Sequence, residues 1–337
     1  MTRAESMLQE VRVEDAVGMV LAHDLTQILP GTFKGSLFRK GHVIREEDIP
    51  ALLRIGKEHI YILRLAEGWL HEDDAARRLA AAAAGANIAL TEPHEGKVSL
   101  NAALSGLVKV DRTFVDGANA VEQVVVSTLR TDTAVKAGQT VAACRVIPLV
   151  TEEERVARVE AAALERSGAQ GGPVWVKPFK PLRAGLVTTG SEVFKGLIED
   201  KFGPVVRAKL ADLGSEVVEQ RLVPDDSDGI VQEIHRFREM GVDLILVTGG
   251  MSVDPDDRTP GAIRRSGANI VSYGTPMLPG SMLMMAYLDG VPVMGLPGCV
   301  MHDPYTSFDV LLPRICAGEI ITRQEIVAMG YGGLHGC

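Results

Sequence analysis

The sequence predicts an α/β protein whose C-terminal half is a three-layer unit with a mainly parallel sheet. From Arg183 onward, apolar runs alternate regularly with amphipathic segments, which is typical of helices packed on a parallel sheet. Apolar residues make up 46% and charged residues 23% of the 337 residues, as in ordinary globular cores. Aromatic residues make up only 4%, which favours α/β packing over an aromatic-rich β-sandwich.

The elements of this half follow from periodicity and turn residues. "RAGLVTTG", "EVVEQRLVP" and "VDLILVTGG" are apolar runs that predict strands. Between them, "FGPVVRAKLADLG" and "DSDGIVQEIHRFREMG" place apolar residues at helical spacing, and Gly214 closes the first helix. "MLMMAYLDGVPVMGLPG" predicts two strands joined by a hairpin at Asp289-Gly290. "DPYTSFDVLLPRICAG" predicts a last helix with Pro304 in its first turn and Gly318 after its end.

Four segments are expected along the chain. Residues 1–66 form a small α+β module, in which "REEDIPALLRIGKEHIYIL" predicts a helix and a strand. Residues 67–173 begin with the alanine-rich helix "HEDDAARRLAAAAAG", continue as a valine-rich β module and end in a helix and a glycine-rich linker. The α/β unit spans 174–318, and 319–337 is a tail.

Charge and cysteine usage argue against several classes of protein. The net charge of −9 argues against a general binder of nucleic acid or anionic membranes. The 4 cysteines include no CxxC pair, which argues against a disulfide framework or a structural zinc site. The start of the chain lacks the apolar core of a signal peptide, and no apolar run is long enough to span a membrane. We therefore expect a cytoplasmic protein without nucleic-acid or membrane partners.

Three predicted strands run directly into loops of small residues: "TTGSE", "TGGMSVDPDD" and "LPGCVMHD". If the three strands are parallel, these loops open on the carboxyl edge of the sheet, where ligands bind in α/β folds. Their glycines permit tight turns and let a ligand approach the backbone. Backbone N–H groups in such loops hold an anion without lysine or arginine, so an acidic protein can still bind an anionic ligand.

At these loops the sequence resembles the molybdopterin-binding domain shared by molybdopterin molybdotransferases and molybdopterin adenylyltransferases. "TTGSEVFKGLIED", "DLILVTGGMSVDPDD", "TPMLPGS" and "VMGLPGC" follow one another as in that family over 183–317, and "VEDAVGMVLAHDL" is distantly similar to the molybdotransferase branch. The resemblance implies binding of molybdopterin or its adenylylated form, with Mg²⁺. It also implies a homo-oligomer that uses molybdate and works with a molybdoenzyme or a cofactor-biosynthesis protein.

The resemblance also implies site residues. The catalytic positions fall on Asp257 and Asp200, and the metal position falls on Asp257. From the residues alone, Asp257 either holds Mg²⁺ and a phosphate or belongs with Asp254 and Asp256 to a solvated turn or cap. The cofactor-binding positions are Thr189, Gly190, Ser191, Glu192, Gly249, Gly250, Ser252, Pro279, Gly280, Pro297, Gly298 and Cys299.

Some family residues are replaced in this chain. Leu278 and Ser281 stand where the family has lysines that neutralise phosphate or molybdate, and "LPGTFKGSLFRKGHVI" stands where the N-terminal module usually has "PPFDNSAMDGYA". Three functions stay open. The protein binds the pterin and assists molybdenum insertion, or it is a cofactor carrier or sensor without turnover, or it is a nucleotide-processing enzyme of related fold. The replaced lysines favour the second function, and the retained acidic positions favour the first.

Cys299 has two interpretations. A thiolate near a helix N-terminus is a good ligand for a soft metal, so Cys299, His302 and Asp303 form a small metal or molybdenum contact. Alternatively, Cys299 fills space beside a helix that Asp303 or His302 caps. If the thiolate is favoured, Cys299 reacts with thiol reagents faster than the cysteines in the β-rich and helical segments.

Overall fold

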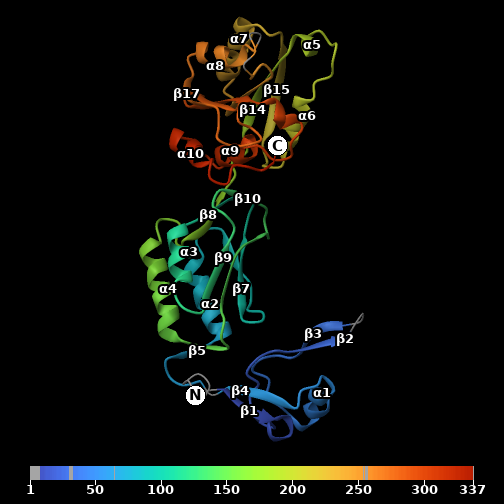
Figure 1. Ribbon diagram of the computed structural model, residues 1–337, viewed down its shortest axis with the longest axis vertical. Helices are drawn as coiled ribbons and strands as arrows, with labels where there is room; N and C mark the ends of the chain where they lie inside the picture. Colours follow the sequence, from blue (N-terminus) through green and yellow to red (C-terminus); the bar gives the residue numbers. More distant parts are fainter. Residues whose placement is uncertain (1–7, 30–32, 64, 253, 255–256, 337) are drawn as a thin grey trace. The chain divides into compact units, whose positions relative to one another are not determined.

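The computed structural model describes residues 8–29, 33–63, 65–252, 254 and 257–336. The chain divides into two compact units. Unit 1 comprises Met1–Ala103, Lys109–Thr131 and Gly138–Trp175, and unit 2 comprises Leu104–Val108, Asp132–Ala137 and Val176–Cys337. Figure 1 shows the helices and strands of both. Over the described ranges, no helix is long and apolar enough to cross a bilayer.

The first part of unit 1 is a small mixed module. Its strands form two antiparallel pairs, β1 with β4 and β2 with β3. A small apolar core holds them together, and Val13, Leu52 and Ile60 belong to it. The elements are β1 (Leu8–Arg12), η1 (Val13–Asp15), β2 (Leu25–Leu29), β3 (Phe33–Phe38), η2 (Glu46–Asp48), α1 (Ile49–Arg54) and β4 (His59–Leu63).

The second part of unit 1 packs helices on a four-stranded antiparallel sheet of order β6-β7-β11-β9. The alanine-rich helix α2 buries Ala76, Ala80 and Ala83, and Arg78 joins it to α4 through Glu160, at 2.8 Å from Nε to Oε1. The elements are β5 (Trp69–His71), α2 (Glu72–Ala83), β6 (Ile88–Leu90), β7 (Lys97–Ala102), α3 (Arg112–Asn119), β9 (Val124–Thr128), β11 (Thr140–Val146), β12 (Val150–Glu152) and α4 (Glu153–Arg166). β5 pairs with β12.

Unit 2 contains the predicted three-layer unit, with a six-stranded sheet of order β15-β14-β16-β19-β18-β17. The first four strands are parallel, and β18 and β17 are antiparallel to their neighbours, which confirms a mainly parallel sheet. The strands are β14 (Arg183–Thr189), β15 (Glu216–Val223), β16 (Leu244–Thr248), β17 (Asn269–Tyr273), β18 (Met284–Leu288) and β19 (Val291–Leu296). A separate three-stranded sheet, of order β10-β8-β13, contains β8 (Gly106–Val110), β10 (Thr133–Val135) and β13 (Val174–Pro178).

Each face of the six-stranded sheet is covered by helices. Successive residues of β16 alternate between the two cores: Leu244 and Leu246 pack with α6, α9 and α10, whereas Ile245 and Val247 pack with α7 and α8. This alternation follows from the two-residue period of a strand. The helices are α5 (Ser191–Phe194), α6 (Phe202–Ala211), α7 (Ser227–Glu239), α8 (Thr259–Arg265), η3 (Gly298–Met301), α9 (Ser307–Cys316) and α10 (Arg323–Ala328).

The structure corrects three local predictions. The helix that the sequence predicted to start near Pro304 is α9. It begins at Ser307 instead, because Thr306 and Asp309 form a capping box at that point. Neither His302 nor Asp303 is therefore its cap. α8 and the edge strand β17 had no predicted counterpart, and the segment expected as a tail contains α10. The predicted hairpin is present, and Asp289 and Gly290 have φ of 48° and 87°.

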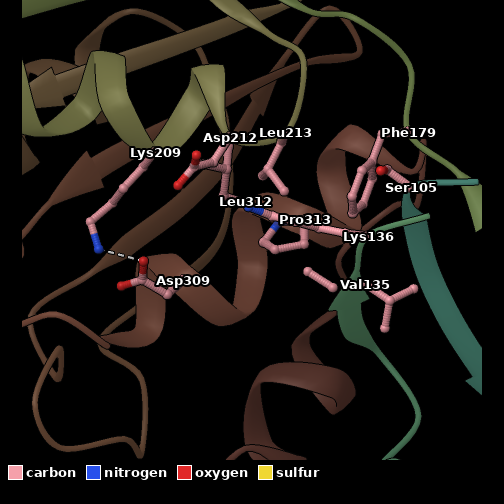
Figure 2. Close-up of a pocket in the computed structure, with 11 residues that line it drawn as sticks. Ser105, Val135, Lys136, Phe179, Lys209, Asp212, Leu213, Asp309, Leu312 and Pro313 are labelled. Atoms are coloured by element: carbon pink, nitrogen blue, oxygen red, sulfur yellow. Dashed lines mark hydrogen bonds and ion pairs between the residues drawn. The ribbon is translucent and has the colours of Figure 1, made fainter. Parts of the chain in front are cut away.

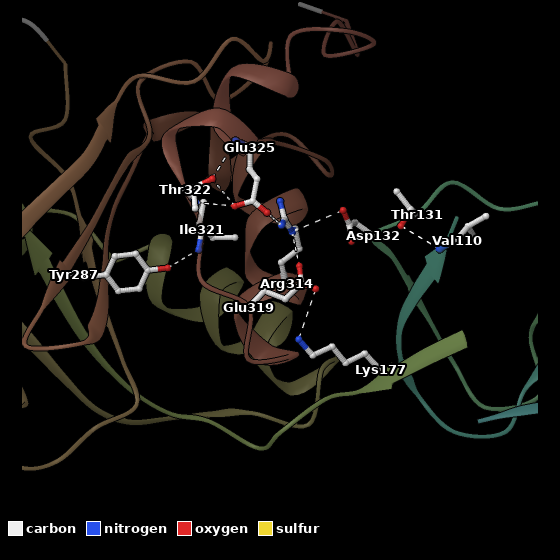
Figure 3. A network of polar contacts seen from close by, with 10 residues as sticks. All are labelled: Val110, Thr131, Asp132, Lys177, Tyr287, Arg314, Glu319, Ile321, Thr322 and Glu325. Atoms are coloured by element: carbon white, nitrogen blue, oxygen red, sulfur yellow. Dashed lines mark hydrogen bonds and ion pairs between the residues drawn. The ribbon is translucent and has the colours of Figure 1, made fainter. Parts of the chain in front are cut away.

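A buried arginine fixes the C-terminal part of unit 2 (Figure 3). Arg314 of α9 is 7% exposed, and its Nε lies 2.9 Å from the Glu319 carboxylate and 3.9 Å from that of Asp132. Its guanidinium also donates to Glu325 of α10. Nearby, the Tyr287 hydroxyl accepts the Ile321 N–H at 2.7 Å. These contacts hold the segment after α9 against the sheet.

Candidate functional site

The three glycine-containing loops lie at one edge of the sheet. β14, β16 and β19 are parallel neighbours, and each ends where its loop begins, after Thr189, Thr248 and Leu296. Carboxyl ends of parallel strands share an edge, as the sequence predicted. Two cavities open there, and Phe202, Gly250 and Asp257 line both.

The first cavity, which we call the Thr189 cavity, has a volume of about 730 Å³. Thr189 is 5% exposed, and its buried Oγ1 has no hydrogen-bond partner among the residues that the structure describes. Burying a hydroxyl without a partner is costly, so this atom points to a ligand that supplies one. The lining residues are Thr188, Thr189, Gly190, Glu192, Val193, Ile198, Glu199, Asp200, Lys201, Phe202, Asp225, Gly250, Asp257, Met301 and His302.

The second cavity, which we call the Cys299 cavity, has a volume of about 720 Å³. Pro279 follows a cis peptide bond, and the Gly280 carbonyl after it accepts hydrogen bonds from Thr275 Oγ1 at 2.9 Å and Ser307 Oγ at 2.7 Å. Buried hydroxyls thus fix this turn. The lining residues are Phe202, Gly249, Gly250, Met251, Ser252, Asp257, Leu278, Pro279, Gly280, Ser281, Met282, Leu296, Pro297, Gly298, Cys299, Asp303 and Gly336.

Gly249 lets the second loop fold tightly against the first. Its φ is +86°, and a Cβ there would lie 2.3 Å from the Thr189 carbonyl oxygen. Thr259 Oγ1 holds the Gly249 carbonyl at 2.7 Å. A side chain at residue 249 would strain the backbone and push the two loops apart, so glycine is required for this cradle.

Asp257 sits in a loop that Tyr273 holds in place. The Tyr273 hydroxyl donates to the Met251 carbonyl at 3.0 Å, and the Asp257 carboxylate accepts the Asp254 N–H at 3.2 Å. Burial raises the pKa of Tyr273, so the hydroxyl stays protonated as a donor. The bond from Asp254 fits the interpretation of a turn, yet the half-buried Asp257 also lines both cavities.

The Asp200 carboxylate accepts hydrogen bonds from nearby protein groups. It accepts the N–H groups of Phe202 and Gly203, at 2.9 and 3.1 Å, and the Gln220 amide at 2.6 Å. This carboxylate therefore fixes the start of α6, and Asp257 is the better candidate for chemistry. Ser191 lines neither cavity; its N–H donates to Asp225 at 2.8 Å.

Cys299 lies in η3 and lines the cavity named after it, with Asp303. His302 lines the Thr189 cavity instead. Across the described part of the chain, no group of three or more His, Cys, Asp or Glu side chains is arranged to hold a metal ion. Burial raises the pKa of the Cys144 thiol to about 12 and that of Cys316 to about 11.

Three features of this site had no clear signal in the sequence. Tyr273 belongs to a strand that was not predicted, Asp225 was one acidic residue among several, and Gly336 lies far along the chain from the loops.

Figure 2 shows another cavity in unit 2, which Phe179, Leu213 and Leu312 line and where Lys209 and Asp309 form an ion pair. Its volume is about 250 Å³.

Comparison with protein families gives a match for parts of the chain. Residues 185–316 match a family model described as a probable molybdopterin binding domain, and residues 10–64 match one described as a domain of unknown function. The first segment contains β14, β16 and β19 with their loops.

Curated relatives match part of the chain. A molybdopterin molybdenumtransferase of Synechococcus elongatus is 29% identical over 186 residues, which are 51% of this chain and 45% of that protein. One from Staphylococcus aureus is 32% identical over 130 residues, 36% of this chain and 31% of that protein. The chain thus spans less than half the length of these relatives.

Among solved structures, the molybdopterin biosynthesis enzyme MoaB of Thermus thermophilus matches with 24% identity and a TM-score of 0.34, over 41% of this chain and 98% of that one. Residues 185–316 therefore match the molybdopterin-binding domain family, and over part of its length the chain resembles molybdopterin molybdenumtransferases.

Proposed function

We propose that unit 2 binds molybdopterin or its adenylylated form, and that the protein assists molybdenum insertion in molybdenum cofactor biosynthesis. The observation that carries this proposal is the buried, unpartnered hydroxyl of Thr189, in a cavity built by loops that match a molybdopterin-binding domain. Such an atom is satisfied when a ligand oxygen or nitrogen enters the cavity.

Residues of both cavities would hold the ligand. Thr189 would donate to it, and the Gly249-Gly250 turn would approach it closely, since Gly250 lines both cavities and Gly249 lines the Cys299 cavity. Lys201 supplies positive charge to the Thr189 cavity. When bound, the pterin supplies the dithiolene that receives molybdenum, and the chain's own residues orient it and shield it from water.

Asp257 is the residue we assign to Mg²⁺. Magnesium commonly binds through one or two carboxylates and ligand phosphates and keeps several waters. Asp257 fits that mode because it lines both cavities, and the described residues offer no larger ligand cluster. The positive charge of the ion would then offset the negative charges of Asp257 and of the ligand phosphate.

The remaining assignments belong to the same proposal. We place the protein in the cytoplasm as a homo-oligomer, with molybdate as co-substrate and a molybdoenzyme or a biosynthetic protein as partner. The four-segment division, with boundaries at 66, 173 and 318, stays a prediction. The second candidate is a non-catalytic cofactor carrier or sensor, which is favoured by Leu278 and Ser281 at the positions of the family lysines.

Calorimetric titration tests the ligand class. Molybdopterin or its adenylylated form should bind more tightly than ATP or NAD, because residues 185–316 match a molybdopterin-binding domain. Equal or tighter binding of the plain nucleotides would replace this proposal with a nucleotide-processing function.

Substitution of Asp257 separates enzyme from carrier. Asp257→Ala should abolish cofactor maturation and leave the circular dichroism spectrum unchanged, because among the described residues of its turn the side chain accepts one hydrogen bond, from the Asp254 N–H. Asp254→Ala is the matched control in the same loop. A variant Asp257→Ala that still supports full maturation would favour the carrier.

A further inference from the structure

The last residues of the described chain lie beside the ligand site. Gly336 lines the Cys299 cavity, although it is far from the other lining residues in sequence. We propose that Gly333–Gly336, which we call the C-terminal strap, is a ligand-binding wall of this cavity and faces an uncharged part of the ligand. The nature of the ligand rests on the proposed function; the position of the wall does not.

The strap is bonded to the cavity rim through its main chain. Leu278 N–H donates to the Gly333 carbonyl at 2.9 Å, and His335 N–H donates to the Leu278 carbonyl at 2.8 Å. The pairing has the form of a parallel bridge between Leu278 and Leu334. The strap thus bonds both the N–H and the carbonyl of Leu278. The Leu278 side chain remains to line the cavity.

Close backbone packing seats the strap in one position. Gly333 is buried, and a Cβ there would lie 2.4 Å from the Met329 carbonyl oxygen and 2.7 Å from that of Pro276. The His335 ring meets the Tyr305 ring edge-on at 4.8 Å between centroids, which ties the strap to the segment after η3. Upstream, Ile326 of α10 is fully buried. The strap is therefore packed against unit 2 as an ordered part of its fold.

The wall that the strap completes carries no positive charge. Among the described residues that line the Cys299 cavity, the charged side chains are Asp257 and Asp303, and none is lysine or arginine. In the Thr189 cavity, by contrast, Lys201 is present. The described lining of the Thr189 cavity also holds several carboxylates, so the charge argument applies to the strap side alone. Because the Cys299 cavity has no lysine or arginine among its described lining residues, the uncharged pterin ring is the part of the ligand that suits the strap.

Alkylation of Cys299 tests the wall without any ligand. Cys299 lines the same cavity, so it should react at least about 5-fold faster with iodoacetamide in Gly333→Ala and in a chain that ends at Gly332. Gly261→Ala is the matched control, since a Cβ there meets nothing within 4 Å. Unchanged rates for Cys144 and Cys316 would show that both units stay folded. An unchanged Cys299 rate in both variants would overturn the proposal.

Ligand experiments test the charge of the wall and separate it from the proposed function. Neopterin, a pterin without phosphate, should slow Cys299 alkylation in the complete chain but not in the chain that ends at Gly332, and inorganic phosphate should slow it in neither. Protection by phosphate alone would overturn the assignment of an uncharged part of the ligand to this wall. Molybdopterin should bind both strap variants at least about 10-fold more weakly. If the complete chain fails to bind molybdopterin, the proposed function is wrong, and the ligand-free rates still decide the strap.

Discussion

The cavities at the carboxyl edge of the sheet and the cluster around Arg314 belong to the same unit. They differ in whether their buried polar groups are paired. In the cluster, Arg314 is shared by Asp132, Glu319 and Glu325. In the Thr189 cavity, the buried hydroxyl of Thr189 has no hydrogen-bond partner within the described part of the chain. Paired polar groups stabilise the fold, whereas an unpaired polar group at a cavity can form its hydrogen bond with a ligand. Substitutions in the two regions should therefore separate stability from binding.

Gly249→Ala should have the largest effect, and it should act on binding. The added Cβ would lie 2.3 Å from the Thr189 carbonyl oxygen, at a φ of +86° that L-residues avoid. We expect molybdopterin affinity to fall at least about 100-fold, because both loops must move. Calorimetric titration measures the loss, with Gly261→Ala as the control that keeps wild-type affinity. If Gly249→Ala bound normally, the cradle would not be part of the site.

Arg314→Ala should reduce stability and leave binding unchanged. Removing one partner of a buried ion-pair cluster costs about 3 kcal/mol, because carboxylates stay behind without their counter-ion. The free energy of opening of unit 2 can be followed by native-state labelling of the buried Cys316, while Cys144 reports unit 1. Arg112→Ala, at an exposed pair with Asp116, is the control. A loss of ligand affinity under native conditions would contradict the separation of the two regions.

The contribution of the cluster should depend on pH in one direction. Burial alone would raise the pKa of Glu325, but the Thr322 backbone N–H and the Arg314 guanidinium lower it below its ordinary value of 4.5. A depressed pKa in the folded state adds stability above the unfolded pKa, and this is lost as pH falls through the folded value. In urea unfolding, the difference between wild type and Arg314→Ala should therefore shrink from pH 7 to below about 4. A constant difference would mean that charge pairing is not what Arg314 contributes.

Tyr273→Phe should have the smallest effect. It removes the hydroxyl that holds the Met251 carbonyl and so loosens the loop of Asp257. A single hydrogen bond contributes about 1 kcal/mol, so affinity should fall about 3- to 10-fold. The ring and its contact with Arg264 remain, so the free energy of unfolding should fall by no more than about 1 kcal/mol. A loss of binding as large as that of Gly249→Ala would show that Tyr273 touches the ligand.

The sequence predicted the parallel strands and their loops because period and glycine placement are local signals. It placed the start of α9 wrongly, since Pro304 suggested a first turn while Thr306 and Asp309 form the actual capping box. The edge strand β17 and the C-terminal strap were not predicted, because short segments are defined by their pairing partners. The resemblance named Ser191 and Asp200 as site residues, and this stays a prediction. In the structure the Ser191 N–H donates to Asp225, and Asp200 lines the Thr189 cavity while accepting hydrogen bonds at the start of α6.

Protection of Cys299 by molybdopterin tests the central claim most directly, because this thiol lies within one of the two cavities. The alkylation rate of each cysteine is mapped by mass spectrometry, with and without the ligand. Cys144 and Cys316 are buried and serve as slow references, whereas Cys337 lies outside the described residues and serves as a sequence-based reference only. We expect Cys299 to react fastest of the three described cysteines and to slow at least about 10-fold with bound molybdopterin. Saturating molybdopterin that leaves the Cys299 rate unchanged would contradict the assignment of the ligand to this edge of the sheet.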